Sequence, residues 1–360
     1  MRKLCLVIPS LHAGGMERVM SELAGYFCDQ PDLEIHMVMY GMKPELFYPT
    51  PSNLIIHQSD WAFNNSQRFW STLKRMVYLR RTIKQIDPVS ILSFGEYWNN
   101  FVLIALKGLK YPVFVSDRCQ PNKTLGKLHD LLRKYLYPRA AGVIAQTGIA
   151  KEIYKKVIPI AKITVIGNPI RKIINDNKIP KENIVLSVGR LIKSKHHDEL
   201  IRLFVKINKP DWTLVIVGGD AIKQQNMSKL KELVRKLNAE DKVILTGSIS
   251  DVDHYYQKSK IFAFTSSSEG FPNVIGEAMS AGLPVIAFDC TAGPSEMIED
   301  EKTGFVVELF DYKIFSEKLK LLMTDESLRQ DLGKNAIFSI KKFGVDKIGE
   351  KFFSLITSNL

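Results

Sequence analysis

Cysteine is scarce in this sequence, and the four cysteines are scattered. They form no Cys-x-x-Cys pair and no cluster with histidine, which argues against a disulfide framework or a zinc site and suits a reducing compartment. Long apolar runs are lacking too. The N-terminal apolar run is about six residues, too short for the core of a signal peptide, and no segment approaches the ~20 apolar residues of a membrane-spanning helix. We therefore expect a cytoplasmic protein.

Several signatures of catalysis and metal binding are also missing. The sequence has no Walker lysine motif and no nucleophile elbow, and no Asp-x-Asp-like pair stands at a strand end to hold Mg²⁺ or Mn²⁺. His12, His196, His197 and His254 lack the spacing of metal ligands. The first glycine loop is not Gly-x-Gly-x-x-Gly, and no acid ends the second strand, so a dinucleotide site is disfavoured. We expect neither a metal ion nor a cofactor.

Charge is distributed unevenly along the chain. The net charge is +12; residues 1–170 carry 22 Lys and Arg against 12 Asp and Glu, and residues 171–360 carry 28 against 26. A basic field of this kind favours an anionic partner such as a phosphate-bearing substrate, an acidic lipid or nucleic acid. Because no basic-aromatic recognition motif is present, we expect no nucleic-acid partner.

Short apolar runs alternate with helical patterns through the whole chain. The strand-like stretches are 3–9, 33–40, 90–94, 112–117 and 142–147 in the first half, and 183–189, 213–219, 242–247, 261–266, 284–288 and 304–308 in the second. Alternation of strand and helix predicts an α/β protein whose parallel sheets are covered on both faces.

The alternating pattern breaks at Gly167-Asn168-Pro169 and resumes after a polar stretch. We therefore predict two doubly wound, Rossmann-like domains, residues 1–168 and 182–344, that face each other across a cleft. Such folds bind ligands at the carboxyl ends of their strands. The final helix, at about 345–360, is expected to cross back onto the first domain.

Two loops after strands carry glycine or basic residues. Gly14 and Gly15 follow the first strand and would let the backbone approach a ligand closely, although a plain tight turn explains them equally well. In the second half, Gly189 and Arg190 follow a strand and Lys195 comes five residues after the arginine. Two fixed cations can neutralise a diphosphate, and the alternative is a pair of solvated basic residues.

The stretch "EGFPNVIGE", residues 269–277, combines a predicted helix start with two acids. Pro272 suits the first positions of a helix, and we expect the amides of residues 273–275 to be available to an anion. Glu277 falls one turn into the helix and can reach sideways to a diol, while Glu269 faces the other side of the anion. The alternatives are an exposed helix residue and a surface turn residue, or the acid/base pair of a glycoside hydrolase.

Taken together and in order, these motifs resemble the glycosyltransferases of family 4, which are retaining enzymes of the GT-B fold. The resemblance covers the whole chain: "SLHAGGMER" resembles the N-terminal glycine loop, "VIGNPI" the interdomain junction, "VGRLIKSK" the Gly-Arg-Leu…Lys element and "EGFPNVIGE" the E-x7-E motif. "FDCTAGPSEMI" further resembles the subgroup that uses UDP-linked hexoses or N-acetylhexosamines.

The resemblance assigns a role to each of these residues. Arg190, Lys195 and Glu269 are implied to be catalytic, the two cations on the diphosphate and the acid on the donor sugar. The remaining implied contacts to the donor are Glu277 on the ribose, the backbone of Ile249 on the base, Gly14 and Gly15 on the diphosphate, and Gly189, Phe271, Pro272, Asn273 and Val274 around the sugar and phosphates.

One position departs from the family pattern. Many members carry Ser-Glu-His where this chain has Ser116, Asp117 and Arg118. The histidine that contacts the donor sugar is absent, so Asp117 and Arg118 become acceptor-side candidates, with Arg118 expected to bind an anionic acceptor.

The resemblance implies metal-independent, retaining transfer of a hexose or N-acetylhexosamine from a UDP-sugar to a glycan acceptor. The setting it implies is lipopolysaccharide, O-antigen or other polysaccharide assembly. A nucleotide-sugar epimerase shares the two-domain architecture and is the alternative function.

Residues 64–85 form a basic amphipathic pattern. Its apolar side holds Phe69, Leu73, Met76, Val77 and Ile83, and near it lie Lys74, Arg75, Arg80, Arg81 and Lys84. The pattern predicts a helix that either rests on an anionic membrane or packs its apolar side on the sheet. With the basic N-terminal half, it favours a lipid-diphosphate-linked acceptor and a peripheral position on the cytoplasmic face of the membrane.

Overall fold

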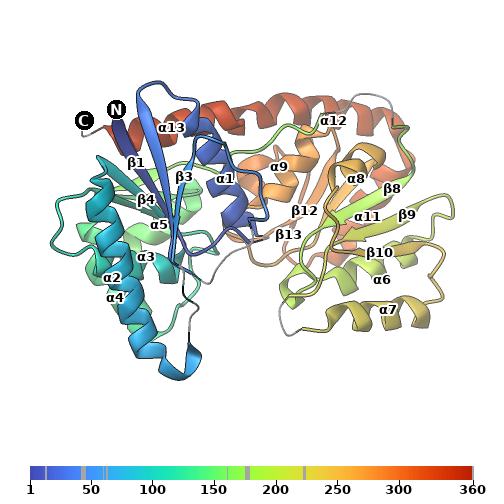
Figure 1. The fold of residues 1–360 in the computed structure, drawn as a ribbon. Helices are drawn as coiled ribbons and strands as arrows, with labels where there is room; N and C mark the ends of the chain where they lie inside the picture. Colours follow the sequence, from blue (N-terminus) through green and yellow to red (C-terminus); the bar gives the residue numbers. More distant parts are fainter. Residues whose placement is uncertain are drawn as a thin grey trace. The chain divides into compact units, whose positions relative to one another are not determined.

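The computed structural model describes residues 1–12, 14–41, 46–59, 61, 64–159, 161–174, 179–221 and 224–358. The chain forms two compact units, one of residues 1–169 with 345–360 and the other of residues 170–344 (Figure 1). Each unit is built on a parallel sheet whose strands are connected through helices. The predicted α/β class with two Rossmann-like domains is therefore confirmed.

The first unit contains a seven-stranded sheet in the order β3-β2-β1-β4-β5-β6-β7. Its strands are β1 (Arg2–Ile8), β2 (Leu33–Met39), β3 (Ile55–Gln58), β4 (Ser90–Phe94), β5 (Val113–Ser116), β6 (Gly142–Ala145) and β7 (Ile163–Val165). Its helices are α1 (Gly15–Cys28), η1 (Asn65–Gln67), α2 (Arg68–Ile86), α3 (Glu96–Ala105), α4 (Lys127–Leu136), η2 (Tyr137–Arg139), α5 (Gly148–Val157) and α13 (Val345–Thr357).

The second unit contains a six-stranded sheet in the order β10-β9-β8-β11-β12-β13. Its strands are β8 (Ile184–Val188), β9 (Thr213–Val217), β10 (Val243–Gly247), β11 (Ile261–Phe264), β12 (Val285–Asp289) and β13 (Gly304–Glu308). Its helices are η3 (Lys193–Lys195), α6 (His197–Ile207), α7 (Asn226–Lys236), α8 (Asp253–Lys258), α9 (Asn273–Ser280), α10 (Pro294–Met297), α11 (Tyr312–Thr324), α12 (Glu326–Ile340) and η4 (Lys341–Phe343).

The strand order reverses at the centre of the second sheet. The chain leaves β8 for β9 on one side and later returns to β11 on the other, and β8 pairs with both in parallel. Connections from adjacent strands that leave in opposite directions open a crevice at the carboxyl ends of those strands. In this unit the loops that follow β8 and β11 meet at the carboxyl ends of these two strands.

Every predicted strand stretch contains a strand of the structure, and two strands had not been predicted. β3 is an edge strand of four partly exposed residues, and β7 has only three residues. Neither stretch is long or apolar enough to show a clear period in the sequence. Each of these two strands is held in the sheet by pairing with an adjacent strand, and that adjacent strand had been predicted.

The final helix, α13, packs on the first unit against α1 and β4. A Cβ atom on Gly349 would lie 2.4 Å from the ring of Tyr26, so the two helices approach too closely there for any larger residue without a shift. Phe352 is fully buried, and its ring centroid lies 6.2 Å from that of Phe94 in β4. The helix is therefore an integral part of the first core.

Replacing Phe352 by alanine tests this docking. Loss of a fully buried aromatic side chain should lower the free energy of unfolding of the first unit by about 3–5 kcal/mol, measured by urea denaturation. Ser354→Ala, at an exposed position of the same helix, should change the stability by less than about 0.5 kcal/mol. Equal effects of both substitutions would show that α13 contributes nothing to this core.

Candidate functional site

The loops after β8 and β9 meet in a contact that only glycine permits. A Cβ atom on Gly218 would lie 1.9 Å from the carbonyl oxygen of Gly189. The backbone amide of Leu191 donates to the carbonyl of Gly219 over 2.8 Å, which ties the two loops together. Gly189 directly follows the last residue of β8, and its role as a donor contact stays a prediction.

The loop after β8 is also fixed to the loop after β11. The amide of Ser267 donates to the carbonyl of Ser194 over 2.8 Å, and the hydroxyl of Thr265 donates to the carbonyl of Lys195 over 2.7 Å. These hydrogen bonds hold the backbone of both loops. They therefore fix the positions from which the side chains of Lys195 and Glu269 extend.

Lys195 and Glu269 form an ion pair at the carboxyl ends of β8 and β11. The distance from Lys195 Nζ to Glu269 Oε1 is 2.5 Å, and both side chains are only 15% exposed. The ammonium also lies 5.1 Å from the centroid of the Phe264 ring. A partly buried pair of this kind combines a cation that can bind phosphate with a carboxylate that can accept hydrogen bonds from hydroxyl groups.

Arg190 is the second predicted cation of this loop. It is exposed, and among the described residues its side chain has no hydrogen bond or ion pair. An exposed guanidinium without a partner is available to an anionic ligand.

His196 adopts a backbone conformation that is unusual for a residue with a side chain. Its φ is 49°, in the left-handed region, between η3 and α6. Its ring lies 2.8 Å from the hydroxyl of Ser267 and edge-on to Phe310, with centroids 5.2 Å apart. Left-handed residues other than glycine are often retained at functional sites, and this one directs the backbone directly after Lys195. The sequence had shown His196 only as a histidine without metal-ligand spacing.

The helix start after Glu269 differs in part from the prediction. Pro272 is the N-cap of α9, but the amide of Asn273 donates to the carbonyl of Phe271 and the amide of Ile275 to that of Pro272. The expectation of three available amides is therefore wrong, because a tight turn uses two of them. Val274 is the one whose amide has no backbone acceptor within the described part of this turn.

Glu277 is buried in α9, so the alternative of an exposed helix glutamate is excluded. The hydroxyl of Tyr256 donates to Glu277 Oε2 over 3.0 Å, and Arg171 Nε lies 3.5 Å from Glu277 Oε1. Arg171 is itself paired with Asp253, with Nη2 to Oδ1 at 2.5 Å. These partners were not predicted because they are distant in the sequence.

Two other predicted donor contacts of this unit belong to its hydrophobic packing. Ile249 follows β10 and packs against the core. Phe271 is buried and lies edge-on to Phe343, with centroids 5.4 Å apart. Both residues are therefore held by packing rather than by polar contacts of their side chains.

The predicted glycine loop belongs to the first unit. The amide of Gly14 donates to the hydroxyl of Tyr48 over 3.1 Å, and this hydroxyl lies 2.9 Å from the carbonyl of Gly14. A Cβ atom on Gly14 would lie 2.2 Å from Oε2 of Glu17. Gly15 begins α1 and is exposed. No pattern in the sequence predicted these contacts of the Tyr48 hydroxyl with the backbone of Gly14.

Asp117 is a buried residue whose carboxylate is held by other side chains, so it is not an exposed acceptor contact. It is 1% exposed; its carboxylate is paired with Arg133 over 2.6 Å and accepts hydrogen bonds from Asn99 over 3.0 Å and from the hydroxyl of Tyr137. Burial raises the pKa of Asp117, and the neighbouring guanidinium of Arg133 opposes this shift. We therefore withdraw Asp117 from the residues expected to touch the acceptor.

Arg118 lies at the carboxyl end of β5 over the face of an aromatic ring. Its guanidinium carbon is 3.4 Å from the centroid of Phe94, and Nη1 donates to Asn168, the asparagine of the "VIGNPI" motif. Nε and Nη2 have no hydrogen-bond acceptor among the described residues, and burial lowers the pKa of Arg118 to about 9. Two buried donors without acceptors suit an anionic group of a ligand.

Within the described ranges no group of three or more His, Cys, Asp or Glu side chains is arranged to hold a metal ion.

Comparison with known proteins places this arrangement in a family. Residues 169–337 match the model of the glycosyl transferases group 1, and residues 13–172 match the model of glycosyltransferase family 4. The two matches account for one unit each. The chain therefore belongs to the family 4, group 1 glycosyltransferases.

Three similar proteins illustrate the range of this family. The chain is 27% identical to the amylovoran biosynthesis glycosyltransferase AmsD of Erwinia amylovora, over 99% of this chain and 100% of that protein. It is 26% identical, over 99% and 98%, to a Campylobacter jejuni α-1,4-N-acetyl-D-galactosaminyltransferase whose name specifies an undecaprenol-diphosphate-linked glycan. It is 31% identical to an uncharacterized glycosyltransferase of Methanocaldococcus jannaschii, over 76% and 73%.

Solved structures agree on the fold. HepE of Anabaena, determined in complex with UDP-glucose, matches with a TM-score of 0.83 and 17% identity over 99% of this chain and 100% of that chain. The fold is thus GT-B, with two Rossmann-like domains, and the chain is a glycosyltransferase.

His197, next to the site, should make the stability of the second unit depend on pH. Burial, with the nearby charge of Lys195 and His196, lowers the pKa of His197 from 6.5 to about 3. Between these values the unfolded chain binds a proton that the native protein does not, so acid favours unfolding. We expect the wild type to lose up to about 1.4 kcal/mol per pH unit relative to His197→Leu below pH 6, in urea titrations. Parallel curves for both proteins would show that His197 is not buried as a neutral group.

Proposed function

We propose that this glycosyltransferase moves a hexose or N-acetylhexosamine from a UDP-sugar to a lipid-diphosphate-linked glycan, with retention of anomeric configuration and without a divalent metal. The observation that carries the proposal is the ion pair of Lys195 and Glu269, 2.5 Å apart at the carboxyl ends of β8 and β11. This ion pair brings the loop that carries Arg190 and Lys195 next to the segment that leads from Glu269 into helix α9.

The reaction creates charge that this site can stabilise. As the bond between the anomeric carbon and the diphosphate oxygen breaks, negative charge grows on the departing UDP. The Lys195 ammonium, the Arg190 guanidinium and the Val274 amide are then the groups that stabilise it, and preplaced donors of this kind act most strongly in the transition state. In this proposal they take the place that a metal ion occupies in other transferases.

The acceptor completes the exchange at the same carbon. Its hydroxyl oxygen forms the new bond on the face that UDP leaves, and its proton passes to a diphosphate oxygen. No carboxylate has to act as general base in this scheme. Glu269 accepts hydrogen bonds from hydroxyls of the donor sugar, and Glu277 is assigned to the ribose, where Tyr256 and Arg171 hold its orientation.

The donor and acceptor classes rest on the relatives. HepE is described with UDP-glucose, and the Campylobacter enzyme is named for a glycan on undecaprenol diphosphate. The unpaired donors of Arg118 support an anionic group in the acceptor. The proposal also keeps Gly14 and Gly15 of the first unit, and Ile249, Phe271, Pro272 and Asn273 of the second, as donor contacts.

A lipid-linked acceptor requires the enzyme to work at a membrane. In the part of the chain that the structure describes, no helix has the length and apolar character needed to cross a bilayer. We propose a peripheral association with an anionic membrane on its cytoplasmic face.

Turnover assays test the chemistry. The enzyme is incubated with a panel of UDP-hexoses and UDP-N-acetylhexosamines, with and without lipid-linked glycan acceptor. We expect UDP release that depends on acceptor and is unchanged by EDTA, and a product whose new linkage keeps the donor's anomeric configuration by NMR. Isomerisation of a UDP-sugar without acceptor would instead identify an epimerase, and an inverted linkage would exclude retention.

Substitution of Lys195 tests the proposed charge stabilisation. Lys195→Ala removes the ammonium that neutralises the departing diphosphate, so kcat/KM should fall by at least about 100-fold. Lys193→Ala, two residues away and exposed, is the matched control and should retain turnover within a factor of about two. Circular dichroism should show the same fold for both variants. Full activity of Lys195→Ala would refute the assignment.

A further inference from the structure

Helix α4 presents its apolar stripe to solvent and its arginine to the core. Leu128 and Leu131 are 67% and 65% exposed, and with Tyr135 they follow a spacing of three and four residues along one face. Arg133, on the opposite side, is buried and paired with Asp117. A surface helix of a globular protein ordinarily has the reverse polarity. The outer face of α4 is therefore suited to contact with an apolar partner surface.

Helix α2 has a similar outer stripe near its N-terminus. Phe69 and Trp70 are 72% and 66% exposed, and Leu73 and Val77 are exposed as well, whereas the residues that pack on the sheet include Leu79 and Ile83. The predicted apolar side is thus divided in the structure. Packing on the sheet uses the C-terminal half of the helix and leaves the aromatic N-terminal half uncovered.

The two stripes belong to one surface of the first unit. Helix α3 packs against both α2 and α4 (Figure 1). Its exposed Tyr97 lies edge-on to His129 of α4, with ring centroids 4.8 Å apart. We call the exposed apolar residues of these helices the α2–α4 surface; they are Phe69, Trp70, Leu73, Val77, Tyr97, Trp98, Leu128, Leu131 and Tyr135.

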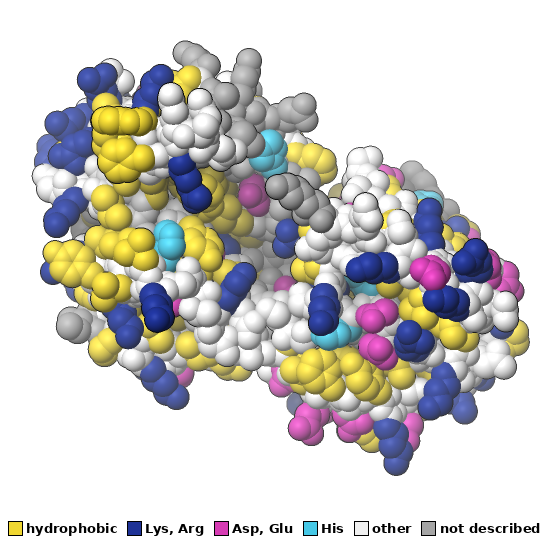
Figure 2. Space-filling view, turned by 90° about the horizontal axis from the view of Figure 1, so that it is seen from below, with side chains coloured by type: hydrophobic (Ala, Val, Ile, Leu, Met, Phe, Trp, Pro, Cys, Tyr) yellow, Lys and Arg dark blue, Asp and Glu magenta, His cyan; other side chains and the backbone are white. Residues whose placement is uncertain are grey.

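Cations surround the apolar residues of the α2–α4 surface. Helix α2 carries six Lys and Arg, of which Arg75 is buried, and no Asp or Glu; α4 adds Lys127 and Lys134 at exposed positions and one acid, Asp130. Lys74 lies 4.4 Å from the ring centroid of Trp61. Figure 2 shows yellow and dark blue side chains side by side over the first unit, with few magenta ones among them. The α2–α4 surface therefore combines exposed apolar side chains with positive charge.

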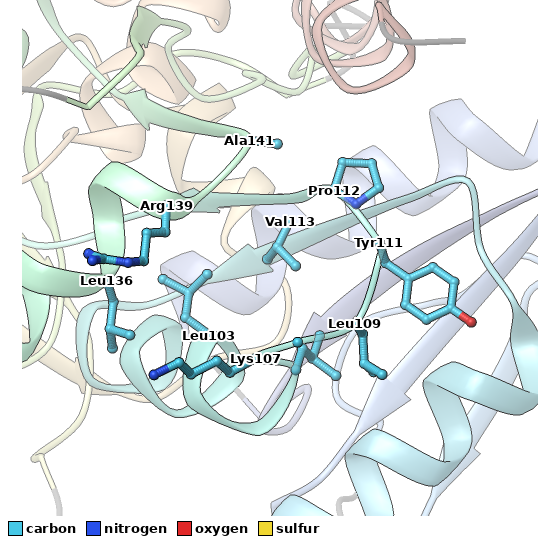
Figure 3. Close-up of a pocket in the computed structure, with 11 residues that line it drawn as sticks. Leu103, Lys107, Leu109, Tyr111, Pro112, Val113, Leu136, Arg139 and Ala141 are labelled. Atoms are coloured by element: carbon cyan, nitrogen blue, oxygen red, sulfur yellow. The ribbon is translucent and has the colours of Figure 1, made fainter.

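A hollow at the C-terminal ends of α3 and α4 has the same combination of apolar and basic side chains. Its volume is about 300 Å³, and apart from Lys107 and Arg139 its described lining is uncharged (Figure 3). Both cations lie over the ring of Tyr135, at 5.6 and 3.8 Å from its centroid. Asp87 lies close by, where it accepts from the hydroxyl of Tyr111. The hollow is lined by residues that precede β5 and β6, so it lies at the amino ends of these strands. Arg118 lies at the opposite, carboxyl end of β5.

We propose that the α2–α4 surface docks on an anionic lipid bilayer. Aromatic and aliphatic side chains can enter the interfacial region while lysines and arginines beside them meet acidic headgroups. A second copy of this chain is a poorer occupant, because two such surfaces would bring their cations face to face. The inference deepens the proposed function and rests on it in one respect, since a lipid-linked acceptor lies in such a bilayer.

Vesicle co-sedimentation tests the surface. The full chain is mixed with vesicles of phosphatidylcholine alone or of phosphatidylcholine with phosphatidylglycerol, at rising salt. We expect binding to the anionic vesicles that weakens as salt rises, and a blue shift of tryptophan fluorescence, because Trp70 enters the interface. Equal binding to both vesicle types, or no binding at low salt, would overturn the proposal.

Paired substitutions locate the contact. Phe69→Ser with Trp70→Ser, and Leu128→Ser with Leu131→Ser, should each weaken binding to anionic vesicles by about tenfold or more, because each pair removes two side chains that would be buried in the interface. The matched control is Ile337→Ser with Phe338→Ser, an exposed apolar pair on α12 of the other unit, which should bind as wild type. Unchanged binding of both surface variants would refute the location.

Two further readouts separate this inference from the proposed function. UDP binding by calorimetry should be the same in the surface variants and the wild type, which also shows that they are folded. If the wild type binds anionic vesicles but transfers no sugar, the surface stands and the transferase proposal fails. If the wild type is a dimer by light scattering and the surface substitutions give monomers, the occupant is a second copy and the membrane proposal is wrong.

Discussion

The reversal of strand order between β8 and β11 is the constraint on which the donor site depends. Parallel strands end at the same edge of a sheet, and a reversal places two loops from distant parts of the chain beside each other there. Lys195 and Glu269 are 74 residues apart in the sequence and form an ion pair for this reason. The glycine contact at Gly218 and the hydrogen bonds from Thr265 and Ser267 hold the loops in position. The chemistry of the site thus follows from the topology of one sheet.

The site brings two acids close to a helix start that favours anions, and the structure shows how this is tolerated. The charge of Glu269 is met by Lys195, and that of Glu277 by the hydroxyl of Tyr256 and the guanidinium of Arg171. A carboxylate with a fixed cationic or hydrogen-bond partner has less tendency to repel a neighbouring phosphate. Each acid can then serve as an acceptor for hydroxyl groups.

Much of the fold could be predicted from the sequence because buried parallel strands are continuous apolar runs. Strands β3 and β7 escaped because they are short and partly exposed. The resemblance assigned Lys195 and Glu269 to one donor site, whereas their ion pair and the contact of Tyr256 with Glu277 needed the tertiary structure. The amides after Pro272 were misjudged because a local turn competes for them, and a pattern of residue types does not show backbone geometry. Likewise, the sequence gave no sign that Leu128 and Leu131 of α4 face outward while Arg133 faces inward.

The central claim is that cations and an amide of the second unit, rather than a metal ion, hold a nucleoside diphosphate. Calorimetric titration of the wild type and of the Arg190→Ala, Lys195→Ala double variant with uridine, UMP and UDP, all in EDTA, tests this claim most directly. The account predicts that affinity rises with each phosphate in the wild type and that most of this rise is lost in the double variant, while uridine binds both equally. The same phosphate dependence in both proteins, or UDP binding that requires a divalent metal, would contradict it.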